Sequence, residues 1–140
     1  MGNKKLAMMR NAGTTCFILV ISLALTACER KWYLDIIDAT DLEYPVLCLS
    51  MKPKCTGDAV DVSILVFDEI DESGKTVRPA WIIQTVSNNP LKIVKFGTTP
   101  IGWTLVKSAI RLEPAKFYRV EGQVFTCRAG KPNNVCTVMP

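Results

Sequence analysis

Histidine is absent from the 140 residues of the sequence. Without an imidazole the chain cannot build Ser/His/Asp or Cys/His nucleophile systems, and it cannot hold zinc or iron through histidine. A long hydrophobic run is also missing. The longest apolar stretch, residues 16–25, is well short of the ~20 residues that a membrane-spanning helix needs. These absences exclude most familiar catalytic designs and a conventional transmembrane anchor.

The amino-terminal segment has the organisation of an export signal. Residues 1–12 carry basic side chains and no acidic one, and the apolar stretch of residues 16–25 follows them. A basic region followed by a short apolar region is typical of a cleaved secretory signal. Residues 25–28, Leu-Thr-Ala-Cys, resemble the bacterial lipobox, in which the cysteine thiol is alkylated by diacylglycerol before cleavage. The alternative is an ordinary secretory signal followed by a structural cysteine.

The lipobox divides the chain into three expected parts. A signal peptide covers residues 1–27, a lipidated Cys28 opens a short tether over residues 28–31, and a folded domain covers residues 32–140. The residue after the cysteine is Glu29, whereas an aspartate there retains proteobacterial lipoproteins at the inner membrane. We therefore expect a periplasmic protein held by its lipid in the inner leaflet of the outer membrane, with the inner membrane as the alternative.

Most of the excess positive charge belongs to the signal. The chain has 17 Lys and Arg against 13 Asp and Glu, and three of the basic residues precede Cys28, so the mature chain carries 14 against 13. No dense basic stripe with interleaved aromatic residues remains, which is the pattern that nucleic-acid binding requires. We therefore do not expect a nucleic-acid partner.

Four cysteines remain in the predicted mature domain besides Cys28: Cys48, Cys55, Cys127 and Cys136. An even number in an exported domain indicates two disulfides, and three pairings are compatible with four cysteines. We favour the local pairs Cys48–Cys55 and Cys127–Cys136, because each encloses a polar, turn-rich segment that a hairpin loop can close. A zinc site of four thiolates would need close Cys-x-x-Cys knuckles, which the sequence lacks.

The mature chain is patterned as a β protein. Short runs of alternating polarity are separated by turn residues, and no stretch keeps a helical period for three turns. We expect a single all-β domain, an antiparallel β-sandwich of the immunoglobulin or fibronectin III type. About eight strands are expected, over residues 32–37, 44–49, 60–67, 80–86, 91–96, 103–110, 117–125 and 135–139, with an acidic hairpin connection over residues 68–75.

One motif carries topological information. Leu112, Pro114, Tyr118 and Val120 follow the order that resembles the corner before a late strand of fibronectin type III domains. In such a corner the tyrosine hydroxyl bonds back to the upstream backbone. The alternative is that Tyr118 is an ordinary aromatic residue of an amphipathic strand.

The carboxylates offer little catalytic chemistry. Asp68, Glu69, Asp71 and Glu72 form the one dense acidic cluster, and its spacing matches no calcium-binding loop. We interpret the cluster as a solvated hairpin tip, because charged residues and glycine suit a turn. We expect no metal, no cofactor and no enzymatic activity; a glycan hydrolase using Asp68 or Asp71 is the catalytic alternative.

Binding remains as the expected activity, and the segment of residues 96–104 is its candidate. It combines glycine, proline and large apolar residues, and loops on a rigid sandwich commonly carry recognition. We predict partner contacts at Phe96, Ile101 and Trp103. For Trp103 the alternative is burial at the end of the core, and a core position is expected for Trp81.

The layout as a whole resembles the type VI secretion immunity lipoproteins of the proteobacterial periplasm. The likeness rests on the lipobox, the short tether, one small sandwich with local cystines, and the segments KFGTTPIGW (residues 95–103) and LEPAKFY (residues 112–118). Such proteins are antidotes kept beside antibacterial effectors. The resemblance implies a protein partner, a secreted toxic effector enzyme, whose active site the chain blocks. The alternative is a structural or assembly lipoprotein of an envelope machine.

Overall fold

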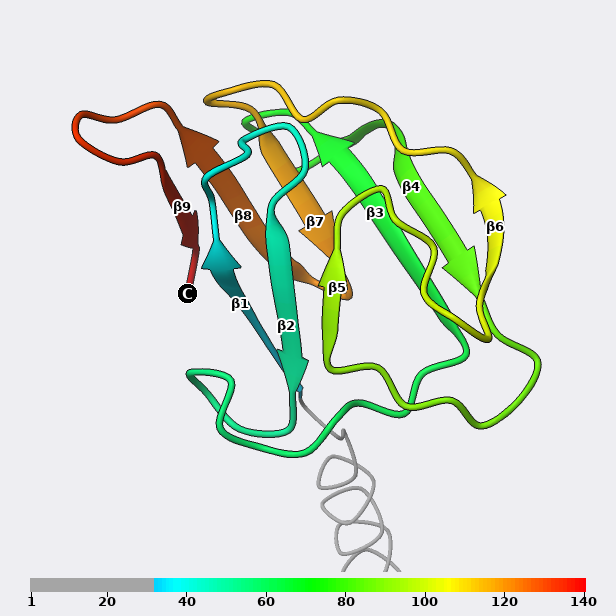
Figure 1. Ribbon diagram of the computed structural model, residues 1–140. Helices are drawn as coiled ribbons and strands as arrows, with labels where there is room; N and C mark the ends of the chain where they lie inside the picture. The colour runs from blue at the N-terminus through cyan, green and yellow to red at the C-terminus, as the bar shows by residue number, and fades with distance from the viewer. Residues whose placement is uncertain (1–31) are drawn as a thin grey trace, which may run out of the picture. The chain divides into compact units, whose positions relative to one another are not determined.

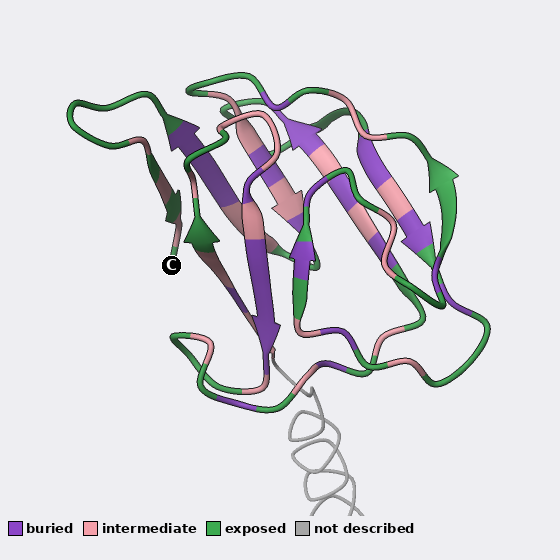
Figure 2. Ribbon diagram, viewed as in Figure 1, coloured by how far each residue is buried: buried purple, intermediate pink, exposed green. Residues whose placement is uncertain are grey.

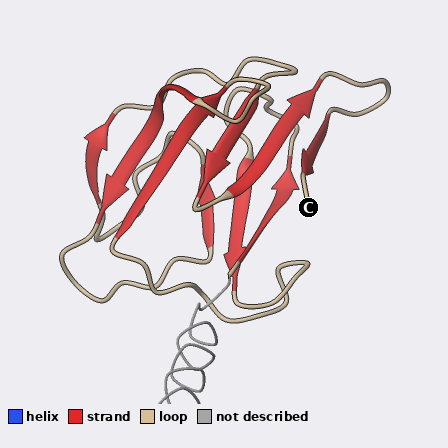
Figure 3. Cartoon of the chain, turned by 180° about the vertical axis from the view of Figure 1, so that it is seen from behind, coloured by secondary structure: helices blue, strands red, loops and turns tan. Residues whose placement is uncertain are grey.

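The computed structural model describes residues 32–140. The predicted signal peptide of residues 1–27, the lipidation site Cys28 and the tether of residues 28–31 lie outside the described residues. Within residues 32–140 every regular element is a β-strand and no helix occurs, as Figure 3 shows. The all-β prediction is therefore confirmed for this part of the chain.

Nine strands form two antiparallel sheets in the described part of the chain. The smaller sheet has the order β1-β2-β5 and the larger one the order β6-β4-β3-β7-β8-β9, and the two pack against each other (Figure 1). The strands are β1 (Tyr33–Asp38), β2 (Val46–Ser50), β3 (Ile64–Ile70), β4 (Thr76–Gln84), β5 (Ile93–Lys95), β6 (Thr104–Lys107), β7 (Phe117–Val120), β8 (Gln123–Arg128) and β9 (Val135–Val138).

Two strands occupy the region where the sequence predicted a single strand over residues 117–125. Glu121 and Gly122 have φ angles of 46° and 79°, and Val120 pairs with Gln123 across them. Positive φ at both central residues is the conformation of a two-residue type I′ hairpin turn. The single-strand prediction is wrong because glutamate stands where asparagine or aspartate usually marks such a turn.

The third predicted strand is displaced along the chain. Alternation placed it over residues 60–67 and an acidic connection over residues 68–75, whereas β3 begins at Ile64 and ends at Ile70. The acidic residues continue the strand because their backbone pairs with β4 on one side and with β7 on the other. The turn between β3 and β4 is accordingly shorter than predicted.

The core lies between the two sheets, where Figure 2 shows buried residues along β2, β3, β4, β7 and β8. At its centre the rings of Phe67, Trp81 and Phe96 contact one another, with centroids 5.2 to 5.5 Å apart. Aromatic pairs at this spacing add stabilisation to the burial of their surface. The core position predicted for Trp81 is confirmed.

Tyr118 makes the corner contact that its motif suggests. Its side chain is fully buried, and its hydroxyl oxygen accepts a hydrogen bond of 2.8 Å from the backbone N–H of Glu113, five residues upstream. This bond fixes the segment that enters β7 against the core. The interpretation as a corner tyrosine therefore describes the residue better than that of an ordinary strand aromatic.

The disulfides join Cys48 to Cys55 and Cys127 to Cys136, as the favoured local pairing predicted. The first connects the middle of β2 to the loop that follows this strand. The second joins directly opposite residues of β8 and β9 and thereby holds the last strand on the larger sheet. Each cross-link closes a short loop, so each restricts the unfolded chain near its own hairpin.

Gln123 fastens the start of β1 to the larger sheet. Its Nε2 donates a hydrogen bond of 3.1 Å to the carbonyl of Trp32, and its Oε1 accepts one of 2.8 Å from the backbone N–H of Leu34. A single side chain thus links the beginning of the described chain to β8. The point at which the chain enters the sandwich is fixed by these two bonds.

Candidate functional site

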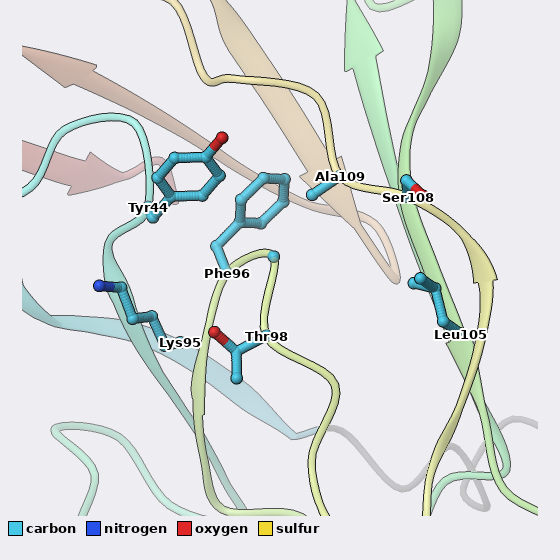
Figure 4. A pocket seen from close by; sticks show the side chains of 8 residues that line it. Tyr44, Lys95, Phe96, Thr98, Leu105, Ser108 and Ala109 are labelled. Carbon is cyan, nitrogen blue, oxygen red and sulfur yellow. The ribbon is translucent and has the colours of Figure 1, made fainter.

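A groove opens between β5 and β6, which are the edge strands of the two sheets on the same side of the sandwich. Its volume is about 440 Å³. Figure 4 shows the rings of Tyr44 and Phe96 on one wall, with Leu105 and Ser108 across from them. The complete lining is Tyr44, Lys95, Phe96, Gly97, Thr98, Leu105, Ser108 and Ala109.

Gly97 shapes the wall of this groove. Its φ of +81° lies in the region that side chains other than glycine disfavour. A Cβ built at this position would lie 2.9 Å from a ring carbon of Tyr44 and 3.2 Å from the Cβ of Ala109. The glycine is therefore required both for the turn after β5 and for the close approach of this turn to the groove wall.

The rim of the groove carries exposed ion pairs. Lys95 lies 3.7 Å from a carboxylate oxygen of Asp41, and Arg111 lies 3.4 Å from one of Glu43. Because all four side chains are about half exposed or more, these pairs add little to stability. Their partners can therefore be exchanged at small cost.

The predicted partner-contact residues have three different positions. Phe96 is fully buried, and its ring lines the groove beside Tyr44 and forms part of the aromatic core. Trp103 is 7% exposed and also packs in the core, whereas Ile101 is 97% exposed. Large rings gain more by filling the space between the sheets than by facing water, and the burial of Trp103 agrees with the core position given as its alternative. Partner contact at the three residues stays a prediction.

The acidic cluster is divided by the structure, which corrects its interpretation as a solvated hairpin tip. Asp68 and Glu69 lie in β3, where successive side chains point to opposite faces. Asp68 lies 3.8 Å from Arg119 on the outer face. Only Asp71 and Glu72 reach the turn, where Asp71 accepts backbone hydrogen bonds from Ser73 and Lys75. The carboxylates therefore do not converge on one catalytic position.

Glu69 is the buried member of the cluster, with 4% of the residue exposed. Arg78 Nε donates a hydrogen bond of 2.7 Å to one carboxylate oxygen, and Lys116 Nζ donates one of 3.0 Å to the other. Burial raises the pKa of this carboxyl, but the hydrogen bonds and charges of the two cations outweigh burial and hold its pKa below the ordinary value. The arrangement is a structural ion cluster beside the Tyr118 corner.

Sequence reasoning found part of the groove and missed the rest. The segment of residues 96–104 was predicted as a recognition element, and its first three residues, Phe96, Gly97 and Thr98, line the groove. Tyr44 and Leu105 were not predicted, because they lie far from that segment in the sequence and meet it only through the pairing of the sheets. No local pattern marks either residue as part of a site.

Two further findings concern the described region, and a third concerns the comparison with known proteins. Within residues 32–140 no group of three His, Cys, Asp or Glu side chains is placed to hold a metal ion. In the same residues no helix is long and apolar enough to cross a membrane. No protein-family model, no curated protein and no solved structure matches this chain.

Proposed function

We propose that the protein is a lipid-anchored periplasmic immunity protein that binds a secreted toxic effector enzyme and blocks its active site. The lipobox-like segment at residues 25–28 supports export and lipid anchoring. The two cystines fit an oxidising compartment outside the cytoplasm. An antidote of this kind needs a rigid binding surface and no active site of its own.

The observation that carries the proposal is the groove between two open sheet edges. β6 has β4 as its only strand neighbour in the described sheet, and all four of its residues are exposed. The free edge of such a strand presents unpaired N–H and C=O groups, to which an extended segment of a partner can add as a further strand. Leu105 would then contact the partner from the groove wall, and Lys95 would meet a carboxylate.

The expected inhibition is steric. A strand or loop at the rim of the effector's catalytic cleft would add to β6, and the sandwich would then cover the cleft. Lipidation at Cys28 would keep the antidote at the membrane and raise its effective concentration toward effectors that act there. This placement suits an effector that attacks phospholipid or peptidoglycan.

The test uses the full-length gene and the effector encoded beside it. Cells that produce the effector in their periplasm should survive when the intact chain is co-expressed. The variant Leu105→Asp should lose protection and bind the effector at least about tenfold more weakly, because it places a charge among apolar contacts. The control Val77→Asp changes an exposed aliphatic residue of β4 away from the groove and should protect as the wild type does.

Failure of the wild-type chain to protect against or bind the neighbouring effector would contradict the proposal. Affinity purification of the mature protein gives a second reading. Recovery of one secreted enzyme in near-stoichiometric amount supports an inhibitor. Recovery of resident envelope proteins instead would favour the alternative, a structural or assembly lipoprotein of an envelope machine.

The type of sandwich is part of the proposal. In fibronectin type III domains the first, second and fifth strands form one sheet, and the other four form the second. Here β1-β2-β5 and β4-β3-β7-β8 have that order, and β6 and β9 extend the larger sheet at its two ends. The hydroxyl contact of Tyr118 at the start of β7 supports the same assignment. The added strand β6 is the one that borders the groove.

A further inference from the structure

One end of the sandwich gathers the start of the described chain and several loops. Tyr33 at the start of β1 pairs with Ser50 at the end of β2. At the same end of the larger sheet, Gln84 at the end of β4 pairs with Ile64 of β3 and with Thr104 of β6. Figure 1 shows these strand ends along the lower side of the molecule. We call this the anchor end, because residue 32 lies there.

Two aliphatic side chains project from the anchor end into solvent. Val86 follows β4 and is 100% exposed, and Ile101 precedes β6 and is 97% exposed. No other large hydrophobic residue of the described chain is as exposed as these two. Full exposure of an aliphatic side chain gains nothing from the hydrophobic effect, so neither residue contributes to the core.

The loops that carry these residues are tied together. Thr85 Oγ1 donates a hydrogen bond to the carbonyl of Gly102 at 3.0 Å, and Asn89 Nδ2 donates one to the carbonyl of Ile101 at 2.9 Å. Each bond joins the 85–89 loop to the turn before β6. Val86 and Ile101 are therefore presented as a pair on a fixed platform and not on two independent loops.

We propose that the anchor end rests on a lipid bilayer, with Val86 and Ile101 inserted at the boundary of headgroups and acyl chains. The inference rests on the proposed lipidation of Cys28. Three residues lie between Cys28 and Trp32, so the two Cα atoms are at most about 14 Å apart when this segment is fully extended. Gln123 fixes the entry of the chain at Trp32, so a lipid on Cys28 holds this end, and no other, beside the membrane.

The balanced charge of the anchor end indicates that insertion of apolar side chains, and not electrostatic attraction to anionic lipid, holds this end on the bilayer. Among the described residues, three lysines and three acidic residues occupy its loops, and their charges balance one another. Anionic lipid should therefore change the contact little. The residues concerned are Lys52, Lys54, Lys92, Asp58, Asp61 and Glu121.

The orientation has a consequence for the proposed effector site. The side of the sandwich with the groove, and the opposite end, remain free when the anchor end faces the lipid. A bound effector would then stand beside the antidote at the membrane surface. This is the geometry in which an inhibitor meets an enzyme that attacks lipid or the adjacent wall.

The test places an environment-sensitive fluorophore on the mature lipoprotein in phosphatidylcholine vesicles. Ile101→Cys carries the probe at the anchor end. The control is Val77→Cys, because Val77 is 57% exposed and lies at the start of β4, at the opposite end of the sandwich. Labelling without reductant leaves the native disulfides closed. Lipids with a nitroxide near the headgroup should quench the probe at position 101 at least about twofold and leave the probe at position 77 unchanged.

A second variant separates insertion from mere proximity. With the probe at Val86→Cys, the additional change Ile101→Asp should reduce quenching toward the level of position 77, because a carboxylate resists transfer into the interface. Replacing a third of the phosphatidylcholine by phosphatidylglycerol should leave the quenching unchanged. Since both side chains are exposed, thermal unfolding should not change.

The intact mass of the purified protein distinguishes the two ways in which the proposal can fail. A mature protein that carries the lipid but shows equal quenching at positions 101 and 77 overturns docking and leaves the immunity proposal standing. If the mature protein carries no lipid, there is no membrane anchor, and both the docking proposal and the assignment of the chain as a lipoprotein are overturned. Selective quenching at position 101 in the lipidated protein supports it.

Discussion

The hydroxyl of Tyr118 offers a clean measurement of what the corner contributes to stability. Tyr118→Phe removes one oxygen from a fully buried side chain and leaves the ring in place. The lost contact is the 2.8 Å hydrogen bond from the backbone N–H of Glu113. A donor left without its partner in a partly buried position costs about 1–2 kcal/mol. For a domain of this size the melting temperature should fall by about 4–8 °C.

Urea unfolding of the disulfide-intact domain, followed by tryptophan fluorescence, measures this difference directly, because Trp81 and Trp103 are buried. The control Tyr44→Phe changes a half-buried tyrosine whose hydroxyl makes no hydrogen bond within residues 32–140. Its midpoint should change by less than about 0.5 kcal/mol. Equal effects of the two substitutions would refute the argument that the Tyr118 hydroxyl fixes the entry to β7.

Three further predictions follow from the buried carboxylate, the second disulfide and the groove wall. Because the pKa of Glu69 is lowered in the folded state, its stabilising effect is present above the ordinary value of 4.5 and is lost as the pH falls below it; Glu69→Gln should flatten that part of the curve of unfolding free energy against pH, and an unchanged slope would contradict it. Replacing Cys127 and Cys136 together by alanine removes the second disulfide and should lower the free energy of unfolding in urea by about 2–3 kcal/mol. An unchanged free energy would show that the hairpin of β8 and β9 is stable without the cross-link. Gly97→Ala should destabilise the domain by about 1–3 kcal/mol, because the site combines a positive φ with a close approach, and a neutral effect in the same assay would show that the turn can relax.

Local patterns in the sequence were sufficient for much of the fold. The two cystine pairs follow from short polar loops between the cysteines, and both are present. The corner motif ending at Tyr118 fixes its own hydrogen bond within five residues. Strands with a clear boundary, such as the first two, lie close to their predicted positions. In each case the residues that determine the feature are neighbours in the sequence.

The features that sequence could not supply depend on distant partners. At residues 64–67 both faces of β3 are apolar, so alternation alone could not decide that Leu65 and Phe67 face the core while Ile64 stays exposed. The burial of Glu69 needs Lys116, 47 residues away, to provide a second hydrogen bond. A carboxylate in an acidic run is normally solvated, and nothing local marks this one as an exception.

For the same reason the sequence predicted only a recognition segment, which forms one wall of the candidate groove, and not the groove itself. Gly97 and its neighbours were identified as a recognition segment, but Tyr44 and Leu105 join it through the arrangement of two separate sheets. The two aromatic residues of the segment, Phe96 and Trp103, are buried in the core, and Ile101 is the exposed one of the three predicted contacts. Sequence identified the right segment and could not assign the direction of its side chains.

The two hydrogen bonds that join Gln123 to the start of the described chain have a mechanical consequence. Tension applied along the axis of β1 from its amino-terminal side loads the hydrogen bonds between β1 and β2 in shear, since those bonds run across the strands. Bonds loaded in shear must rupture together, whereas bonds peeled from one end part in sequence. The two bonds from Gln123 carry part of this load into β8. The sandwich should therefore resist a pull at its amino-terminal end, where a membrane tether would act.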